Sequence, residues 1–158
     1  MRVAIFFGFV GAMSIANTSW AECKDADPAF MARFMAKAEE VYDKQTDLTW
    51  QRCAVGQRWE QSSGCLGNPS KFTFDQAQAQ TNAKWRVPTI DELQSIVAEY
   101  CTEPAVDPAL FPGTPSEQFW SNAFYSPMAF YVSFRNGSSN PTYYSDSRYN
   151  VRLVRSGR

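Results

Sequence analysis

The strongest constraint on the fold lies in residues 85–93, where a tryptophan and a proline lead into a clearly marked helix start. Thr89 and Glu92 have the spacing of a capping box, in which each side chain accepts a hydrogen bond from the other residue's backbone amide. Beyond them, apolar residues recur at intervals of three and four, so one helix face must pack against a core. These apolar residues are Ile90, Leu93, Val97 and Tyr100. We therefore expect a core-anchoring helix that begins after Thr89 and ends near residue 100.

The other regular elements follow from capping and alternation. A second capping box at residues 73–76 predicts an Ala- and Gln-rich helix that ends near Asn82. Apolar residues alternate strictly over residues 128–135, which predicts a strand, and Asn136-Gly137 then favours a tight hairpin turn. The other main strands predicted are residues 48–52 and 150–155.

The first 21 residues have the pattern of a secretory signal peptide. One positive charge at Arg2 precedes an apolar run over residues 3–15, and residues 19–21 form a small-x-small cleavage pattern. A membrane anchor is the alternative, but the run is shorter than the roughly 20 apolar residues that span a bilayer. We therefore expect residues 22–158 to form one domain of a periplasmic or secreted protein.

Four cysteines follow the predicted signal peptide, and an even number in an exported chain predicts two disulfides. Three pairings are possible. The turn-forming residues 62–64 favour a short loop closed by Cys53 and Cys65, and closing it would contribute roughly 3 kcal/mol in the chain-entropy model. Cys23 and Cys101 would then form the second bridge. A four-cysteine metal site is the alternative, although the chain has no close Cys-x-x-Cys pair.

The chain contains no histidine. This removes the commonest general base, the commonest zinc ligand and every Ser–His or Cys–His nucleophile arrangement. Asp91 and Glu92 are explained by helix capping, and no spacing isolates a catalytic pair that includes Asp107 or Asp146. We therefore expect no catalytic residues, no metal site and no cofactor.

Positive charge is concentrated at the C-terminal end, where residues 118–158 carry five arginines against one acid, Asp146. Such asymmetry can mark an anionic partner, although scattered solvated arginines on strands are the alternative. Tyrosines lie near Arg148, and this combination suits sugar rings or sulfate groups. A solvated loop that packs its own tyrosines is the competing interpretation. The candidate ligand-binding residues from this region are Arg135, Arg148, Arg152, Tyr143 and Tyr144.

Five short motifs, taken in order, resemble the Lcl C-terminal domain family, named for a collagen-like bacterial adhesin. They are Asp43-x-x-Thr46-x-Leu48-x-Trp50, Trp85-Arg86-x-Pro88-x-x-x-Glu92-Leu93, Phe111-Pro112, Trp120-Ser121 and Val151-Arg152-x-Val154-Arg155. Around Cys53 and Cys65, the chain also looks like the cysteine-containing branch of that family. The resemblance implies a C-type-lectin-like α+β fold with two helices packed on a mostly antiparallel sheet with long loops.

The resemblance changes the interpretation of residues 27–41. Asp27-Pro28 looks like an N-cap followed by a first helical position, and apolar side chains then keep helical spacing, so propensity favours a helix. The resemblance implies instead that residues 33–36 and 40–43 are paired strands. Both interpretations remain open at this point.

The resemblance also divides the tryptophans into two groups. Those in the shared motifs are implied to be structural, together with other motif residues; the set is Trp50, Trp85, Pro88, Thr89, Glu92 and Trp120. Trp59 lies outside these motifs, in the cysteine loop, and we expect it to be an exposed platform for a sugar ring. C-type lectins bind calcium and sugar through Glu-Pro-Asn or Gln-Pro-Asp, whereas this chain has Ser139-Asn140-Pro141, so we expect no calcium cage.

The family is mostly uncharacterised, and the best-known role of its namesake is adhesion to anionic polysaccharide. We therefore expect an exported, non-catalytic binding module whose partner is an extracellular polysaccharide. No Gly-X-Y repeat precedes the domain, so we do not expect the namesake's trimerising collagen stalk. The alternatives are a protein-interaction or structural subunit of a bacterial envelope assembly, and an enzyme such as a formylglycine-generating-like oxidase. We expect no nucleic-acid partner and no membrane span once the signal peptide is removed.

Overall fold

The computed structural model describes residues 22–143 and 147–158. The predicted signal peptide, Tyr144 and Asp146 lie outside these residues. The helices are α1 (Pro28–Ala32), α2 (Phe74–Gln78) and α3 (Ile90–Ser95). The strands are β1 (Glu22–Cys23), β2 (Phe34–Lys37), β3 (Glu40–Asp43), β4 (Leu48–Gln51), β5 (Arg58–Glu60), β6 (Gly64–Leu66), β7 (Cys101–Thr102), β8 (Gln118–Tyr125), β9 (Met128–Ser133), β10 (Ser138–Tyr143) and β11 (Val154–Ser156).

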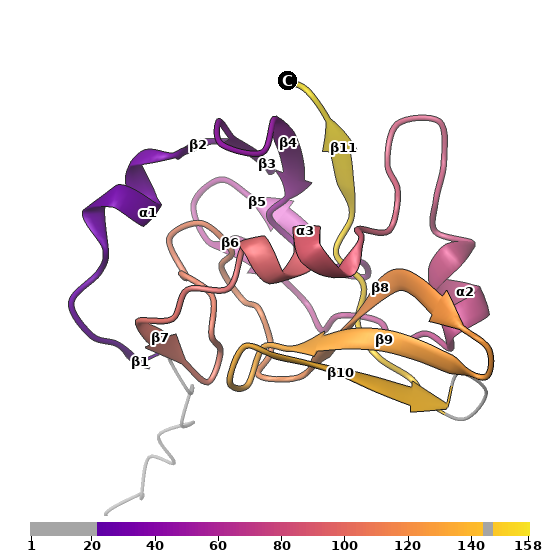
Figure 1. Ribbon diagram of the computed structural model, residues 1–158. Coiled ribbons are helices and arrows are strands. Elements are labelled where there is room, and N and C mark those ends of the chain that lie inside the picture. The colour runs from indigo at the N-terminus through magenta and orange to yellow at the C-terminus, as the bar shows by residue number, and fades with distance from the viewer. Residues whose placement is uncertain (1–21, 144–146) are drawn as a thin grey trace, which may run out of the picture.

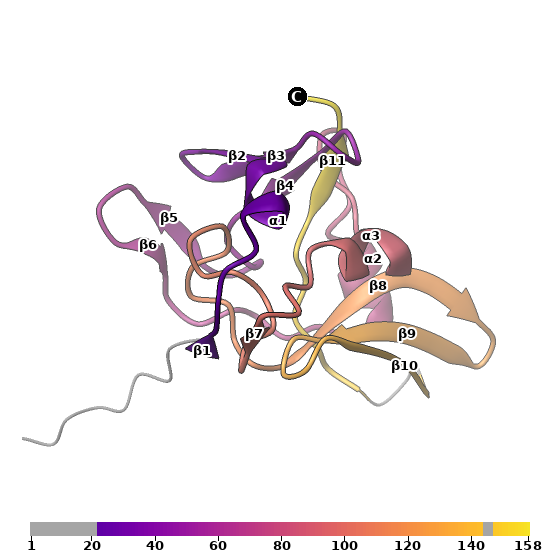
Figure 2. The same ribbon diagram turned by 60° about the vertical axis from the view of Figure 1, so that its left-hand side comes forward.

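All of these strands pair antiparallel with their neighbours, in four separate sheets. The largest has the order β11-β4-β3-β2, and a three-stranded sheet has the order β10-β9-β8. Figures 1 and 2 show these two sheets on opposite sides of the molecule, with α3 between them. The α+β prediction is confirmed, with three short helices where two were predicted.

The core fills the space between the two larger sheets. Side chains from both sheets and from α3 form one buried cluster, which includes Trp50, Leu93 and Phe119. A second cluster packs α2 against β8 and contains Trp85 and Trp120. Burying these aromatic side chains supplies a large part of the hydrophobic free energy of a chain of this size.

The capping box of α3 is present as predicted. The Thr89 hydroxyl accepts from the Glu92 amide at 3.1 Å, and the Glu92 carboxylate accepts from the Thr89 amide at 2.8 Å. The helix ends at Ser95 rather than near Tyr100, because the Ala98 amide donates to the carbonyl of Ala105 instead of continuing the helix. A tertiary hydrogen bond therefore sets the length of this helix.

Helix α2 also has its predicted capping box and is also shorter than predicted. It ends at Gln78 because Asn82 takes part in a turn of its own. The side-chain oxygen of Asn82 accepts from the backbone amides of Lys84 and Trp85, and the backbone amide of Asn82 donates to the carbonyl of Trp85. Such side-chain bonds compete directly with helical ones.

Both interpretations of residues 27–41 are partly correct. Asp27 caps α1 through a 2.8 Å hydrogen bond from the Ala29 amide, with Pro28 in the first helical position. The helix lasts only to Ala32, and β2 and β3 then pair as the resemblance implied. Ala38, with φ of 47°, lies in the tight turn between them.

The two disulfides join Cys53 to Cys65 and Cys23 to Cys101, which confirms the favoured pairing. The first closes the loop that contains the β5–β6 hairpin. The second fastens the N-terminal strand β1 to β7, where Cys23 lies opposite Cys101.

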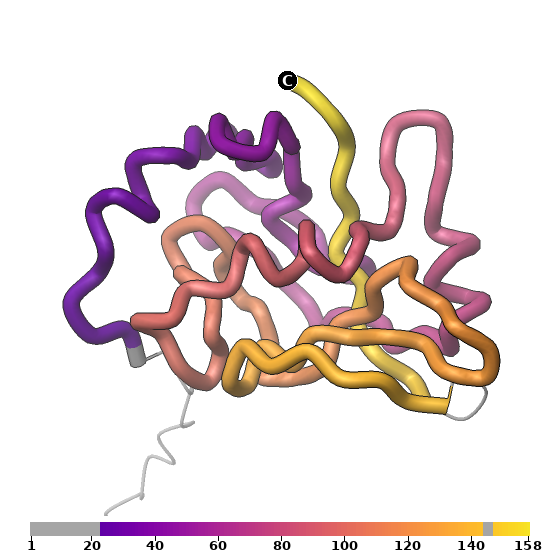
Figure 3. The backbone as a smooth tube through the Cα atoms, in the orientation of Figure 1, coloured from indigo at the N-terminus to yellow at the C-terminus, as the bar shows by residue number. Residues whose placement is uncertain are grey.

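The C-terminal segment differs from the single strand predicted over residues 150–155. Only Val154–Ser156 form a strand, β11, because the preceding residues bond to several partners in turn. The carbonyl of Asn150 accepts from Trp120, that of Val151 from Val55, and that of Leu153 from Gln51. Figure 3 shows this segment running from the three-stranded sheet to the four-stranded one, so it connects the two halves of the core.

Candidate functional site

The two exposed arginines among the candidate ligand-binding residues, Arg135 and Arg148, do not share one surface. Arg135 is exposed and lies 3.5 Å from Glu103, which follows β7. Arg148 is also exposed, but it donates to Gln76 of α2. Figure 1 shows β7 and α2 at opposite ends of the molecule, so these two cations cannot contact the same short stretch of ligand.

Arg152 lies in the core, with no exposed surface. Its guanidinium donates to the backbone carbonyls of Gln51 and Arg52 and to the Thr114 hydroxyl. It also lies over the ring of Phe111, at 4.7 Å from the centroid. Burial, together with the charge of Arg52, lowers the pKa of Arg152 to about 9. This placement removes Arg152 from the candidate ligand-binding residues, since a polysaccharide cannot reach it.

The remaining sequence candidates are two tyrosines and one tryptophan. Tyr143, at the end of β10, is 64% exposed, and its neighbour Tyr144 lies outside the described residues. Trp59, in β5, is half-buried, whereas the three tryptophans of the shared motifs are buried in the two core clusters. Trp59 is therefore the tryptophan that a ligand can reach most easily within residues 22–143 and 147–158.

Trp59 stacks against Arg52, whose guanidinium carbon lies 4.3 Å from the ring centroid. Arg52 donates to the carbonyls of Leu110 at 2.9 Å, Ala38 at 3.0 Å and Ala109 at 2.7 Å. Because a guanidinium has five N–H groups, two donors remain for another acceptor. Burial lowers the pKa of Arg52, and no acid in the described part of the chain forms an ion pair with it. Arg52 is thus a fixed cation whose charge is not neutralised.

Arg52 and Trp59 line a surface cavity of about 680 Å³, which we call the basic cavity. Its other polar side chains are Lys37, Gln61 and Ser63, and no acidic side chain of the described residues lines it. Lys37 is exposed at the end of β2. Two cations beside an aromatic ring form a site that suits a sugar carrying a carboxylate or sulfate group.

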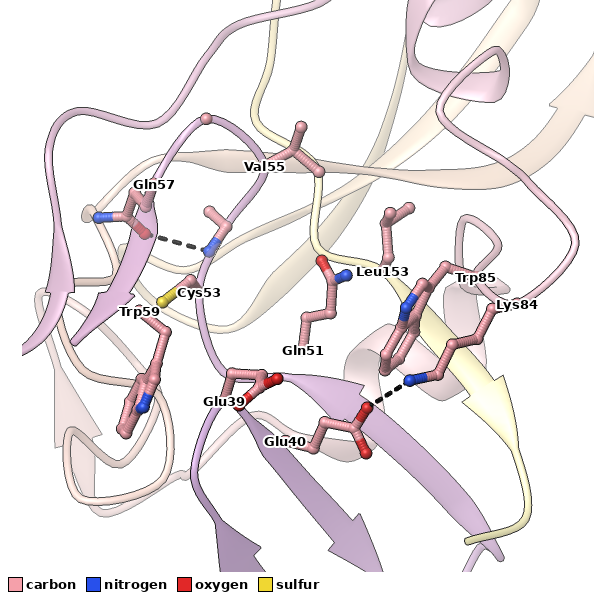
Figure 4. A pocket seen from close by; sticks show the side chains of 12 residues that line it. Glu39, Glu40, Gln51, Cys53, Val55, Gln57, Trp59, Lys84, Trp85 and Leu153 are labelled. Carbon is pink, nitrogen blue, oxygen red and sulfur yellow. Dashed lines mark hydrogen bonds and ion pairs between the residues drawn. The ribbon is translucent and has the colours of Figure 1, made fainter. Parts of the chain in front are cut away.

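Trp59 also lines a second cavity, of about 400 Å³, which we call the acidic cavity. Figure 4 shows Trp59 and Trp85 on its two sides, with Glu39, Glu40 and Gln51 between them. Both volumes lie within the range of about 300–1,000 Å³ that is usual for small-molecule sites. Two aromatic walls with carboxylate and amide groups between them can bind the ring and the hydroxyl groups of a sugar.

The charge of Glu40 is neutralised within the protein. Its carboxylate accepts from Lys84 at 2.8 Å and from Arg155 at 3.0 Å. Burial acts to raise the pKa of Glu40, but these two hydrogen bonds and charges outweigh it and hold the pKa below its ordinary value. A glycosidase needs one carboxylic acid with a raised pKa, and the lowered pKa of Glu40 does not suit that role.

Sequence reasoning identified Trp59 but missed its neighbours Lys37, Glu39 and Arg52. Arg52 directly precedes a cysteine in the shared context, which was the one available signal. Lys37 and Glu39 reach the site because the β2–β3 turn lies beside the cysteine loop, and nothing local in the sequence indicates this contact. In residues 22–143 and 147–158, no group of three or more His, Cys, Asp or Glu side chains is placed to hold a metal ion. No helix in the same ranges is long and apolar enough to cross a bilayer.

Comparison with known families supports the resemblance seen in the motifs. The model of the Lcl C-terminal domain matches residues 39–155, well over half of the chain, which confirms the resemblance. No curated protein and no solved structure matches the chain. The C-type-lectin-like assignment therefore stays a prediction, while the α+β architecture is established by the elements themselves.

Proposed function

The chain belongs to the Lcl C-terminal domain family, and from this premise we propose that it is a non-catalytic, adhesin-like module that binds an anionic polysaccharide. The two disulfides fit a periplasmic or extracellular location, because such bonds persist in oxidising compartments. We place the binding site in the basic cavity, at Arg52, Lys37 and Trp59, instead of at the C-terminal arginines.

One observation carries this proposal: Arg52 is a partly buried cation without an acidic partner in the described residues, stacked on an accessible tryptophan. A buried charge without a counter-ion is unfavourable, so an anion that binds beside Arg52 gains a favourable ion pair that the unliganded protein does not have. The two remaining N–H groups of its guanidinium supply directional donors for a carboxylate or sulfate. Trp59 adds a surface for the sugar ring.

The test compares charge reversal inside and outside the basic cavity. Lys37→Glu adds a negative charge to the cavity rim, and we expect it to weaken binding to an immobilised sulfated polysaccharide by about fivefold or more. Lys44→Glu is the matched control, since Lys44 is an exposed lysine in the turn after β3, away from the cavity lining. Trp59→Ala should weaken binding by about tenfold.

Affinity should also fall as salt is added, because exposed charges are screened. Equal losses in Lys37→Glu and Lys44→Glu would show that binding depends on net charge alone and would contradict the assigned site. Each variant is first compared with the wild type in thermal unfolding, so that a folding defect is not mistaken for a binding defect.

A second candidate function is protein interaction, as a subunit of an envelope assembly. Tyr125 and Tyr143 are 75% and 64% exposed. Both lie opposite Met128 in the three-stranded sheet, so the three side chains form one row across β8, β9 and β10. An exposed aromatic row of this kind is common at protein interfaces. If this row is the protein-binding surface, Tyr125→Ser should abolish co-purification with an envelope partner and leave polysaccharide binding unchanged.

A further inference from the structure

Trp59 belongs to both cavities, and these cavities differ in charge. The basic cavity contains Lys37 and Arg52 and no acid of the described residues, whereas the acidic cavity contains Glu39 and Glu40 with one cation, Lys84. The β2–β3 hairpin contributes to both, since Lys37 ends β2, Glu39 lies in the turn and Glu40 begins β3. A chain molecule that crosses Trp59 therefore meets opposite charges on its two sides.

The two carboxylates of the acidic cavity are not equivalent. Glu40 is held by Lys84 and Arg155, as described above. Glu39 has no hydrogen-bond or ion-pair partner for its side chain within residues 22–143 and 147–158, and it is exposed. In Figure 4 its carboxylate lies between Trp59 and Glu40, within the cavity. Glu39 is thus the group of this cavity that can pair with a cation brought by a ligand.

Building on the proposed function, we infer that the polysaccharide is zwitterionic, with an acidic sugar bound beside Arg52 and Lys37 and an amine-bearing sugar bound beside Glu39. Trp59 separates the two sugars and contacts both. A free ammonium group gives Glu39 an ion pair, whereas an acetamide in its place offers only a neutral donor. The two cavities together therefore select the order of charges along the polymer as well as its anionic character.

The experiment uses two polymers that differ at one group. One is an alternating polymer of uronic acid and hexosamine with free amines, and the other is the same preparation after chemical N-acetylation. Binding of the oxidised protein to each is measured at one low salt concentration and near neutral pH. We expect the free-amine polymer to bind about three- to fivefold more tightly, as one accessible ion pair would provide.

Two substitutions locate the preference. Glu39→Gln keeps the size of the side chain and removes its charge, so it should abolish the preference for the free-amine polymer. Glu99→Gln is the matched control, because Glu99 is exposed and does not line either cavity. It should keep the full preference.

The outcomes separate this inference from the function on which it rests. Equal binding of the two polymers, or a preference that survives in Glu39→Gln, would overturn the zwitterionic ligand while leaving anionic polysaccharide binding in place. Absence of binding to both of these polymers and to sulfated polysaccharide would overturn both proposals. A preference lost in Glu39→Gln and kept in Glu99→Gln would support the inference.

Discussion

Arg152→Ala should strongly destabilise the protein, because the guanidinium of Arg152 is a buried hub of hydrogen bonds. It connects the C-terminal segment to the end of β4, through the carbonyls of Gln51 and Arg52, and to the loop at Thr114. Hydrogen bonds to charged groups contribute about 1.5–3 kcal/mol each. The desolvation cost of the buried cation offsets part of that sum. We expect a net loss of about 3–5 kcal/mol in the free energy of unfolding.

The assay is urea-induced unfolding at neutral pH with both disulfides intact, followed by tryptophan fluorescence. Arg148→Ala serves as the reference, since Arg148 is exposed, and its loss should stay within about 0.5 kcal/mol. A loss below about 1 kcal/mol for Arg152→Ala, similar to that of the reference, would refute the reasoning. It would mean that the buried hydrogen bonds do not hold the two halves of the core together.

Three further predictions concern the helix cap and the cysteine loop. Thr89→Ala should lower the free energy of unfolding by about 1 kcal/mol in urea titrations, because the backbone amide of Glu92 loses its hydrogen-bond acceptor. Burial acts to raise the pKa of Glu92, but hydrogen bonds from Arg86 and Thr89 outweigh it and lower the pKa. The ionised Glu92 carboxylate therefore stabilises the fold at neutral pH, and this stabilisation is lost as the pH falls through the lowered pKa. Glu92→Gln should therefore be less stable than the wild type at neutral pH in thermal scans, and the difference should shrink as the pH falls below the ordinary glutamate pKa and through the lowered pKa of Glu92. Replacing Cys53 and Cys65 together by serine should cost about 3 kcal/mol in chemical unfolding, and it should weaken polysaccharide binding because the closed loop carries the tryptophan of the site.

Local signals in the sequence predicted local structure well. The capping boxes at Thr73 and Thr89 depend on residues only a few positions apart, and both are present. A hairpin turn also forms at Gly137, with φ of 77°, but it takes up residues 134–137, so β9 ends at Ser133 instead of continuing to residue 135. The ends of the helices were not predictable in the same way. Helix α3 stops where Ala98 bonds to Ala105, and no helix propensity encodes that partner. Hydrogen bonds to residues outside the helix therefore set where the helix ends.

The position of the candidate site was even less predictable from the sequence than the ends of the helices. A count of arginines indicated a basic C-terminal surface, but a count gives no information about where the fold puts each side chain. The fold buries Arg152 and separates Arg135 from Arg148. Trp59 could be identified because it lies in the cysteine loop, outside the motifs that form the core. Its contact with Arg52 depends on how that loop folds back, so the cation at the site became visible only in the structure.

The location of the ligand is the central claim, and side-chain NMR tests it most directly. An anionic oligosaccharide is titrated into isotopically labelled protein while the indole N–H signals of the tryptophans and the Nε–H signals of the arginines are followed. The account predicts saturable shifts at Trp59 and Arg52, with the Arg135 and Arg148 signals unchanged. Shifts confined to Arg135 or Arg148, with Trp59 and Arg52 unchanged, would contradict it.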